Sequence, residues 1–243
     1  MRLGLAIGGF AAIVTLTFRA IAKDQKRIWS FPVAAVRGDA WKPALGVIGT
    51  TAALVALDPV SAPWLQRPAF QDTPAMRRIN RVLSGRNMAM AINAAPLSFF
   101  LGGLARGSSF AGQTGLLAGE AAASAEIVAM TMKHLDRRMR PIEVGPEGNF
   151  TRTWFRTKSR DIDGAGCFPS GHTAAAFAIA SVVAARYRGA AWGAYGMAGI
   201  VGASRLTSRA HFPSDVFLGA ALGYSIGRFV VVPRSLAPMP PKR

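Results

Sequence analysis

The chain has 243 residues, of which 51% are apolar and 17% are charged. Soluble domains carry roughly 25% charged residues, so the composition favours a membrane protein over an Ala-rich soluble bundle, and the length fits one domain. The net charge of +17 suits nucleic acid, anionic lipid headgroups or a phosphorylated substrate. Because the basic residues fall between apolar blocks and form no single stripe, we expect no nucleic-acid partner.

The first apolar segment, residues 1–22, has two readings. Arg2, an apolar run and Ala20-Ile21-Ala22 resemble a signal peptide with a small-residue cleavage site. Arg19 weakens that reading and favours an uncleaved first helix. Both readings leave the same downstream chain, so the alternative stays open.

Six further apolar blocks follow, separated by short basic or Pro/Gly-bearing connections. Trp41 and Trp64 flank the first of them as interface anchors do, and small residues let membrane helices approach closely. We therefore predict an all-α, integral-membrane bundle of about six transmembrane helices over residues 23–232. Residues 67–86 are expected to form a surface or interfacial loop with an amphipathic turn, and the Pro-rich residues 233–243 a disordered tail. The blocks cover residues 43–60, 87–105, 110–132, 172–187, 189–204 and 214–232.

The first motif is Lys133 followed, after six residues, by Arg140-Pro141. The two cations lie about two helical turns apart and can face one site, while Pro141 marks the end of the helix. By itself this pair is more typical of plain interfacial anchors than of a functional site.

The second motif, Pro169-Ser170-Gly171-His172, directly precedes an apolar run. Ser170 can cap the helix, Gly171 lets backbone approach a ligand closely, and the free N–H groups of the first turn can bind an anion such as phosphate. An ordinary capped helix start explains the serine and the glycine equally well, but leaves His172 unexplained.

The third motif comprises Ser204-Arg205, His211 and Asp215. If His211 and Asp215 lie on one turn, the carboxylate can accept a proton from one imidazole nitrogen and leave the other nitrogen basic. A capped helix start at Pro213 beside a bystander histidine is an equally good reading of this fragment alone.

Together the motifs supply cations, an anion-binding helix start, two histidines and a carboxylate, each at the end of an apolar block. Every position matches the signature of the type-2 phosphatidic acid phosphatase superfamily, and the chain resembles its membrane branch. That superfamily includes lipid phosphate phosphatases, soluble bacterial acid phosphatases and vanadium haloperoxidases. The resemblance is carried by residues between Lys133 and Asp215, and the first half of the chain contains no motif.

The resemblance implies a metal-independent phosphatase that hydrolyses a lipid phosphate monoester or pyrophosphate through a phosphohistidine intermediate. His211 would be the nucleophile, Asp215 would orient it, and His172 would protonate the leaving oxygen and then activate water. Three cations can neutralise the phosphoryl oxygens without Mg²⁺, so we expect neither a cofactor nor a metal. The residues expected to hold the phosphate are Lys133, Arg140, Ser170, Gly171 and Arg205.

Several other reactive residues are expected to lie outside the chemistry. Cys167 is the only cysteine, and the position where a cysteine phosphatase would need an arginine is Thr173. His134 faces away from the side of the helix that carries Lys133, and the chain has too few histidines for a zinc cluster. Glu126 interrupts an apolar helix on the same face as Lys133 and is expected to support the site indirectly.

The expected partners are a phosphorylated lipid substrate and membrane lipids, while the identity of the lipid and the oligomeric state stay open. The resemblance implies a multi-pass protein of the bacterial cytoplasmic membrane with its site on the extracytoplasmic face. An inserted first helix would reverse that orientation, and the distribution of basic residues does not decide it. Two alternatives remain: a vanadate-dependent haloperoxidase-like protein, and a non-enzymatic membrane protein, which would leave His172 and Asp215 without a purpose.

Overall fold

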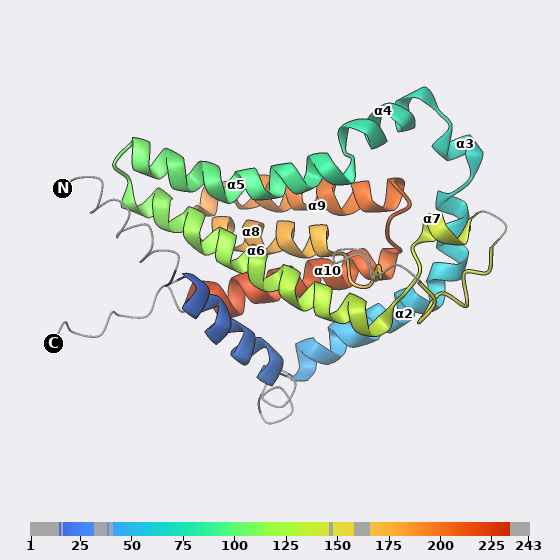
Figure 1. Ribbon diagram of the computed structural model, residues 1–243, viewed down its shortest axis with the longest axis horizontal. Helices are drawn as coiled ribbons and strands as arrows, with labels where there is room; N and C mark the ends of the chain where they lie inside the picture. The colour runs from blue at the N-terminus through green and yellow to red at the C-terminus, as the bar shows by residue number, and fades with distance from the viewer. Residues whose placement is uncertain are drawn as a thin grey trace.

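The computed structural model describes residues 15, 17–31, 38, 41–145, 148–157 and 166–233. All regular secondary structure in these residues is helical, which confirms the predicted all-α bundle. The long helices α5, α6, α8, α9 and α10 run side by side along the longest axis of the molecule, and α2 crosses beside one end of α6 and α10 (Figure 1).

Each of the six apolar blocks between residues 43 and 232 forms a helix, and shorter helices connect them. The blocks form α2 (Trp41–Leu65), α5 (Gly85–Ala105), α6 (Ser109–Asp136), α8 (Gly171–Arg186), α9 (Ala191–Thr207) and α10 (Pro213–Ser225), which continues as a π-helical turn, Ile226–Val231. The connecting helices are α3 (Pro68–Gln71), α4 (Pro74–Val82), α7 (Pro141–Val144) and a 3₁₀ turn, Arg188–Ala190.

Residues 67–86 contain more helix than the sequence predicted. The hydroxyl of Thr73 accepts a hydrogen bond from the amide of Met76, and Pro74 occupies the first turn, so the local signals start α4 without help from the core. None of its residues is buried, in keeping with the expected interfacial position. Ser84 caps the next helix, α5, by accepting from the amide of Asn87.

Helix α8 lies at the centre of the bundle and packs on α6, α9 and α10 through small side chains. Ala174 and Ala178 of α8 and Ala121 and Ala125 of α6 are buried in one apolar cluster. A side chain at Gly223 of α10 would collide with the carbonyl oxygen of Ala174, so glycine there allows the two helices to touch backbone to backbone.

Four segments are long and apolar enough to cross a membrane: Trp41–Leu65, Gly85–Ala105, Ser109–Val144 and Pro213–Val231. Leu45, Ile48 and Val60 on α2 and Leu97 and Leu104 on α5 are exposed on the bundle, as lipid-facing side chains are. Helices α8 and α9 have 16 and 17 residues and fall short of the roughly 20 that span a bilayer. The predicted number of about six spans therefore stays a prediction.

The two ends of the chain were assigned from the sequence to a signal peptide or first helix and to a disordered tail. Residues 17–31 are helical, but most of residues 1–22 lie outside the described residues. Of the tail, only residue 233 is described. Both assignments remain predictions.

Candidate active site

The residues of the three motifs meet at one end of the bundle. Lys133 lies in the last turn of α6, Arg140 precedes α7, and Ser170 to His172 begin α8. Arg205 lies in the last turn of α9, His211 in the connection that follows, and Asp215 in the first turn of α10. The ends of these helices lie on the same side of the molecule (Figure 1).

Electrostatic repulsion within this group reflects its closeness. Besides burial, the positive charges of Arg205 and Lys133 lower the pKa of His172. Those of Lys133 and Arg140 lower the pKa of His211 in the same way. Arg205 and Arg140 in turn repel each other. A cluster of cations around two histidines is the arrangement expected where an anionic group binds.

His211 is buried and has a defined tautomer. Its Nδ1 lies 2.7 Å from the carbonyl oxygen of Cys167 and 3.4 Å from Oδ2 of Asp215. Both neighbours are acceptors, so Nδ1 carries the proton and Nε2 keeps its lone pair. Burial lowers the pKa of His211, which Asp215 partly opposes, and the imidazole is therefore neutral.

Asp215 was expected to orient His211. In the structure, Asp215 and the backbone carbonyl of Cys167 both face Nδ1 of His211. The backbone carbonyl of Cys167 is closer to Nδ1 than the carboxylate is. Oδ2 of Asp215 also accepts a hydrogen bond from the amide of Phe212 at 2.8 Å. The backbone carbonyl of Asp215 accepts from the amide of Ser170 at 2.9 Å, which joins the start of α10 to the start of α8.

A fully buried arginine, Arg138, holds Asp215 in place from behind. Its Nη1 lies 2.6 Å from Oδ1 of Asp215 and donates to the hydroxyl of Ser214 at 2.8 Å. Its Nη2 lies 2.6 Å from Oδ2 of Asp58 on α2. The guanidinium also lies over the ring of Phe212, 4.0 Å from its centroid. Two carboxylates therefore share one arginine in the interior.

His172 contacts the first residue of α5, and Arg205 contacts the connection between α4 and α5. Nε2 of His172 donates to the carbonyl oxygen of Gly85 at 3.1 Å, and Nη2 of Arg205 donates to that of Leu83 at 2.6 Å. Nε of Arg205 donates to the hydroxyl of Ser204 at 3.1 Å. Burial, and then the charge of Arg205, lowers the pKa of His172 to about 4, so this imidazole is neutral in the free protein.

Ser170 and Gly171 form the start of α8 as the sequence indicated, but their contacts differ from the expected ones. The buried hydroxyl of Ser170 shares a hydrogen bond of 2.8 Å with that of Thr173 and caps no backbone amide. A side chain at Gly171 would collide with the carboxylate of Glu126. Glycine is thus needed here for the approach of a side chain from α6, in addition to any ligand.

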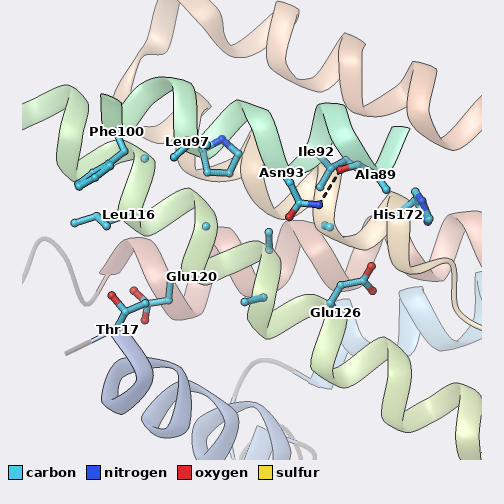
Figure 2. A pocket seen from close by; sticks show the side chains of 16 residues that line it. Thr17, Ala89, Ile92, Asn93, Leu97, Phe100, Leu116, Glu120, Glu126 and His172 are labelled. Carbon is cyan, nitrogen blue, oxygen red and sulfur yellow. Dashed lines mark hydrogen bonds between the residues drawn. The ribbon is translucent and has the colours of Figure 1, made fainter. Parts of the chain in front are cut away.

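A cavity of about 500 Å³ opens between α5 and α6 and reaches the site. His172 lies at one end of it, and Phe100 and Leu116 lie at the other (Figure 2). The wall between them is largely apolar and includes Ile92 and Leu97. Polar side chains also line it, namely Asn93, Glu120, Glu126 and Thr17.

Residues 114–235, half of the chain, match the PAP2 superfamily. The chain belongs to this superfamily. The PAP2 region contains every motif residue from Lys133 to Asp215 and all of α8, α9 and α10, and it leaves α2 with Asp58 outside. Lipid A 1-phosphatase of Porphyromonas gingivalis is 39% identical over 71 residues, which are 28% of this chain and 16% of that protein. No solved structure matches.

One cluster that includes the motif residues His211 and Asp215 has the composition of a metal site. Ligand atoms of Cys167, His211 and Asp215 lie within 4.8 Å of one another. Burial raises the pKa of the Cys167 thiol well above its usual range, and Sγ donates to the carbonyl of Met139 at 3.2 Å. Asp215 is bound to Arg138, whose charge opposes a cation at the same carboxylate. The cluster fits a hydrogen-bond network better than a metal site.

Two buried residues that connect to the motif residues, Asp58 and Arg138, were missed from the sequence. Asp58 interrupts the apolar block 43–60, and an acidic residue in such a block needs a buried partner, which was the available signal. Arg138 lies in the basic run between Lys133 and Arg140, where nothing local separates a buried arginine from an interfacial one. His134, which was expected from the sequence to lie apart from the chemistry, is exposed, and its Nδ1 lies 2.7 Å from the carbonyl oxygen of Met130.

Proposed function

We propose that this protein is a metal-independent phosphatase that hydrolyses a lipid phosphate monoester or pyrophosphate through a phosphohistidine intermediate. The observation that carries the proposal is the tautomer of His211. Its Nδ1 proton is held by the carbonyl of Cys167 and by Asp215, so a neutral Nε2 is available near the cationic side chains of Lys133 and Arg140. A neutral nitrogen with a fixed orientation is what attack on phosphorus requires.

The cations supply the charge that phosphoryl transfer needs. Lys133, Arg140 and Arg205 would hold the equatorial oxygens, with Ser170 and the backbone of Gly171 at the start of α8. Positioning and charge neutralisation account for most of the catalysis of phosphoryl transfer. The same five residues suit a phosphate better than a neutral ligand, because three of them are cations and the other two offer a hydroxyl and a backbone at a helix start.

The proposed reaction has two steps. In the first, the substrate monoanion passes its proton to the neutral imidazole of His172. Nε2 of His211 forms a bond to phosphorus, the bond from phosphorus to the leaving oxygen breaks, and His172 gives that oxygen the proton. In the second, water attacks the phosphohistidine, His172 takes a proton from the water, and the nitrogen–phosphorus bond breaks to release inorganic phosphate. Asp215 and Cys167 stabilise the imidazole of His211 throughout.

A lipid substrate is supported by the surroundings of the site. The cavity that ends at His172 has a largely apolar wall. It lies between α5 and α6, and both helices are long and apolar enough to cross a membrane. A hydrocarbon chain can occupy such a cavity while its phosphate reaches the cations. The name of the similar Porphyromonas gingivalis protein, lipid A 1-phosphatase, supports the same class of substrate.

The proposed location is the bacterial cytoplasmic membrane, with several spans and the site on the extracytoplasmic face. The chain is well suited to a test, because its single cysteine, Cys167, is fully buried. Asn149 is exposed on the loop beside the site, so Asn149→Cys places one accessible thiol there. Labelling by a membrane-impermeant maleimide in intact cells is expected, and labelling only after lysis would place the site on the other face.

Phosphate release by the detergent-purified protein tests the function. A panel of lipid monophosphates and lipid pyrophosphates should include substrates that release phosphate in the presence of EDTA, with vanadate as a competitive inhibitor. Release that stops on chelation and returns with Mg²⁺ or Zn²⁺ would contradict the metal-independent mechanism. No release from any member by a folded protein would contradict the enzyme itself.

A further inference from the structure

We propose that Glu126 selects the leaving group, so that the site takes phosphate monoesters whose alcohol carries a hydroxyl or ammonium group near the ester oxygen and disfavours lipid pyrophosphates. This inference rests on the proposed phosphatase function and narrows its substrate class. It concerns the end of the cavity at His172, where the leaving oxygen must lie if His172 protonates it.

Glu126 lies at the junction of the phosphate site and the cavity. It lines the same cavity as His172, and its carboxylate reaches the backbone of Gly171, the residue before His172. Its side chain extends from α6 toward the end of the cavity where His172 lies (Figure 2). A leaving group protonated by His172 must therefore pass beside this carboxylate.

The side-chain amide of Asn93 on α5 also offers a hydrogen-bond acceptor to the cavity. Nδ2 of Asn93 donates one of its two hydrogens to the carbonyl of Ala89 at 2.8 Å, and Oδ1 is then an acceptor that can meet a ligand. The cavity near His172 is thus lined by the carboxylate of Glu126 and the amide of Asn93 before its wall becomes apolar toward Leu97 and Phe100, and the carboxylate offers acceptors alone. Acceptors recognise hydroxyl and ammonium groups of a ligand.

The charge of the leaving group distinguishes lipid phosphate monoesters from lipid pyrophosphates, the two substrate classes that the proposed function leaves open. When a lipid pyrophosphate is cleaved, the leaving group is itself a phosphate and places negative charge beside Glu126. An amino alcohol or polyhydroxyl alcohol places donors there instead. Like charges brought together at a site disfavour binding, while the donor groups are attracted to the carboxylate.

A purely structural role for Glu126 makes a different prediction. A carboxylate near a helix start can stabilise the helix dipole of α8, and its loss would then slow all substrates alike. A selective role changes the ratio between substrates. The informative quantity is therefore a ratio of kcat/KM values measured on one protein preparation.

The experiment compares two substrates in mixed micelles: a long-chain 2-amino alcohol phosphate and a diacylglycerol pyrophosphate. The wild type is expected to prefer the amino alcohol phosphate, and Glu126→Gln to shift the ratio roughly tenfold toward the pyrophosphate. Asp72→Asn makes the same chemical change at an exposed position on another segment and should leave the ratio unchanged.

A second variant adds charge instead of removing it. Asn93→Asp, at an exposed position of α5, should shift the ratio away from the pyrophosphate and decides the question if Glu126→Gln does not fold. The inference is overturned if the wild type prefers the pyrophosphate, or if the folded variants leave the ratio as it is. The proposed function fails separately, when the wild type releases phosphate from neither substrate.

Discussion

Nη1 of Arg138 lies 2.6 Å from Oδ1 of Asp215, and both side chains are fully buried. The same guanidinium binds Asp58 at 2.6 Å, so α2 is tied to the start of α10 through one arginine. The carboxylate that faces His211 on one side is thus fixed from the other side by a helix outside the PAP2 region. We therefore expect stability and catalysis to depend on the same three charges.

The ion pair between Asp58 and Arg138 should therefore contribute a measurable part of the free energy of unfolding. Asp58→Asn removes the charge that Arg138 and the backbone and hydroxyl of Ser214 share, and leaves a buried guanidinium partly uncompensated. We expect a loss of about 3–5 kcal/mol of unfolding free energy, seen as a lower thermal unfolding midpoint in detergent. Asp72→Asn, at an exposed position, is the matched control. Equal midpoints for both variants would show that the pair contributes nothing to stability.

Asp215→Asn should impair catalysis less than the loss of a triad carboxylate usually does. The carbonyl of Cys167, at 2.7 Å, continues to hold the Nδ1 proton of His211 when the carboxylate is gone. We expect turnover to fall roughly 100-fold, compared with about 10,000-fold in a serine-protease triad. Phosphate release and thermal unfolding are measured on the same sample, because Asp215 also binds Arg138. Loss as complete as in His211→Ala, in a folded variant, would mean that the carbonyl does not fix the tautomer.

Arg205→Lys should be severely impaired although it keeps the charge. A lysine cannot present two parallel N–H groups to two phosphoryl oxygens, so kcat/KM is expected to drop roughly 100- to 1,000-fold. Arg209→Lys is the control, since its backbone carbonyl accepts from the amide of Ile142 whichever side chain is present. If the two variants lose activity equally, Arg205 does not bind the phosphate.

A phosphoenzyme should be trapped on one histidine variant and not on the other. His211→Ala lacks the nucleophile and should take up no label from any substrate. His172→Ala lacks the proposed acid and water activator, so an aryl phosphate with a good leaving group should still phosphorylate it, and label should accumulate. Rapid quenching with labelled substrate measures this. The bond is expected to be acid-labile and base-stable, and label on His211→Ala would mean that another residue attacks.

The pH dependence should show that the substrate brings the catalytic proton. Burial lowers the pKa of both histidines, that of His172 to about 4, so both are neutral above their lowered values. As pH falls, activity should therefore persist below the usual histidine pKa of about 6.5 until His211 becomes protonated. As pH rises, kcat/KM should fall through the second ionisation of the substrate phosphate, about pH 6 for an alkyl phosphate.

Changing the substrate separates its ionisation from that of a residue. An aryl phosphate has a lower second pKa than an alkyl phosphate, so the alkaline limb of the kcat/KM profile should move to lower pH by the same amount. A limb that stays in place for both substrates would assign the ionisation to the protein, and His172 would then hold its own proton before substrate binds.

Much of the fold could be predicted because membrane helices are encoded locally. The apolar blocks gave six helices at nearly the observed positions, since a run of small and apolar residues forms a helix and packs by close approach of Ala and Gly. The length of helix α4 was underestimated, because one amphipathic turn was expected where the structure has a helix over Pro74–Val82. Its start depends on Thr73 and Pro74, which are short-range signals that an overall basic character concealed.

The sequence by itself determined the set of chemical groups: cations, two histidines and a carboxylate at fixed spacings along the chain. Only the tertiary structure decided which atoms meet. The carbonyl of Cys167 holds His211, Asp58 of α2 reaches Asp215 through Arg138, and Glu126 lies against Gly171 beside the cavity. Backbone carbonyls have no sequence signature, and a buried charge pair forms between distant helices only when packing removes both partners from solvent.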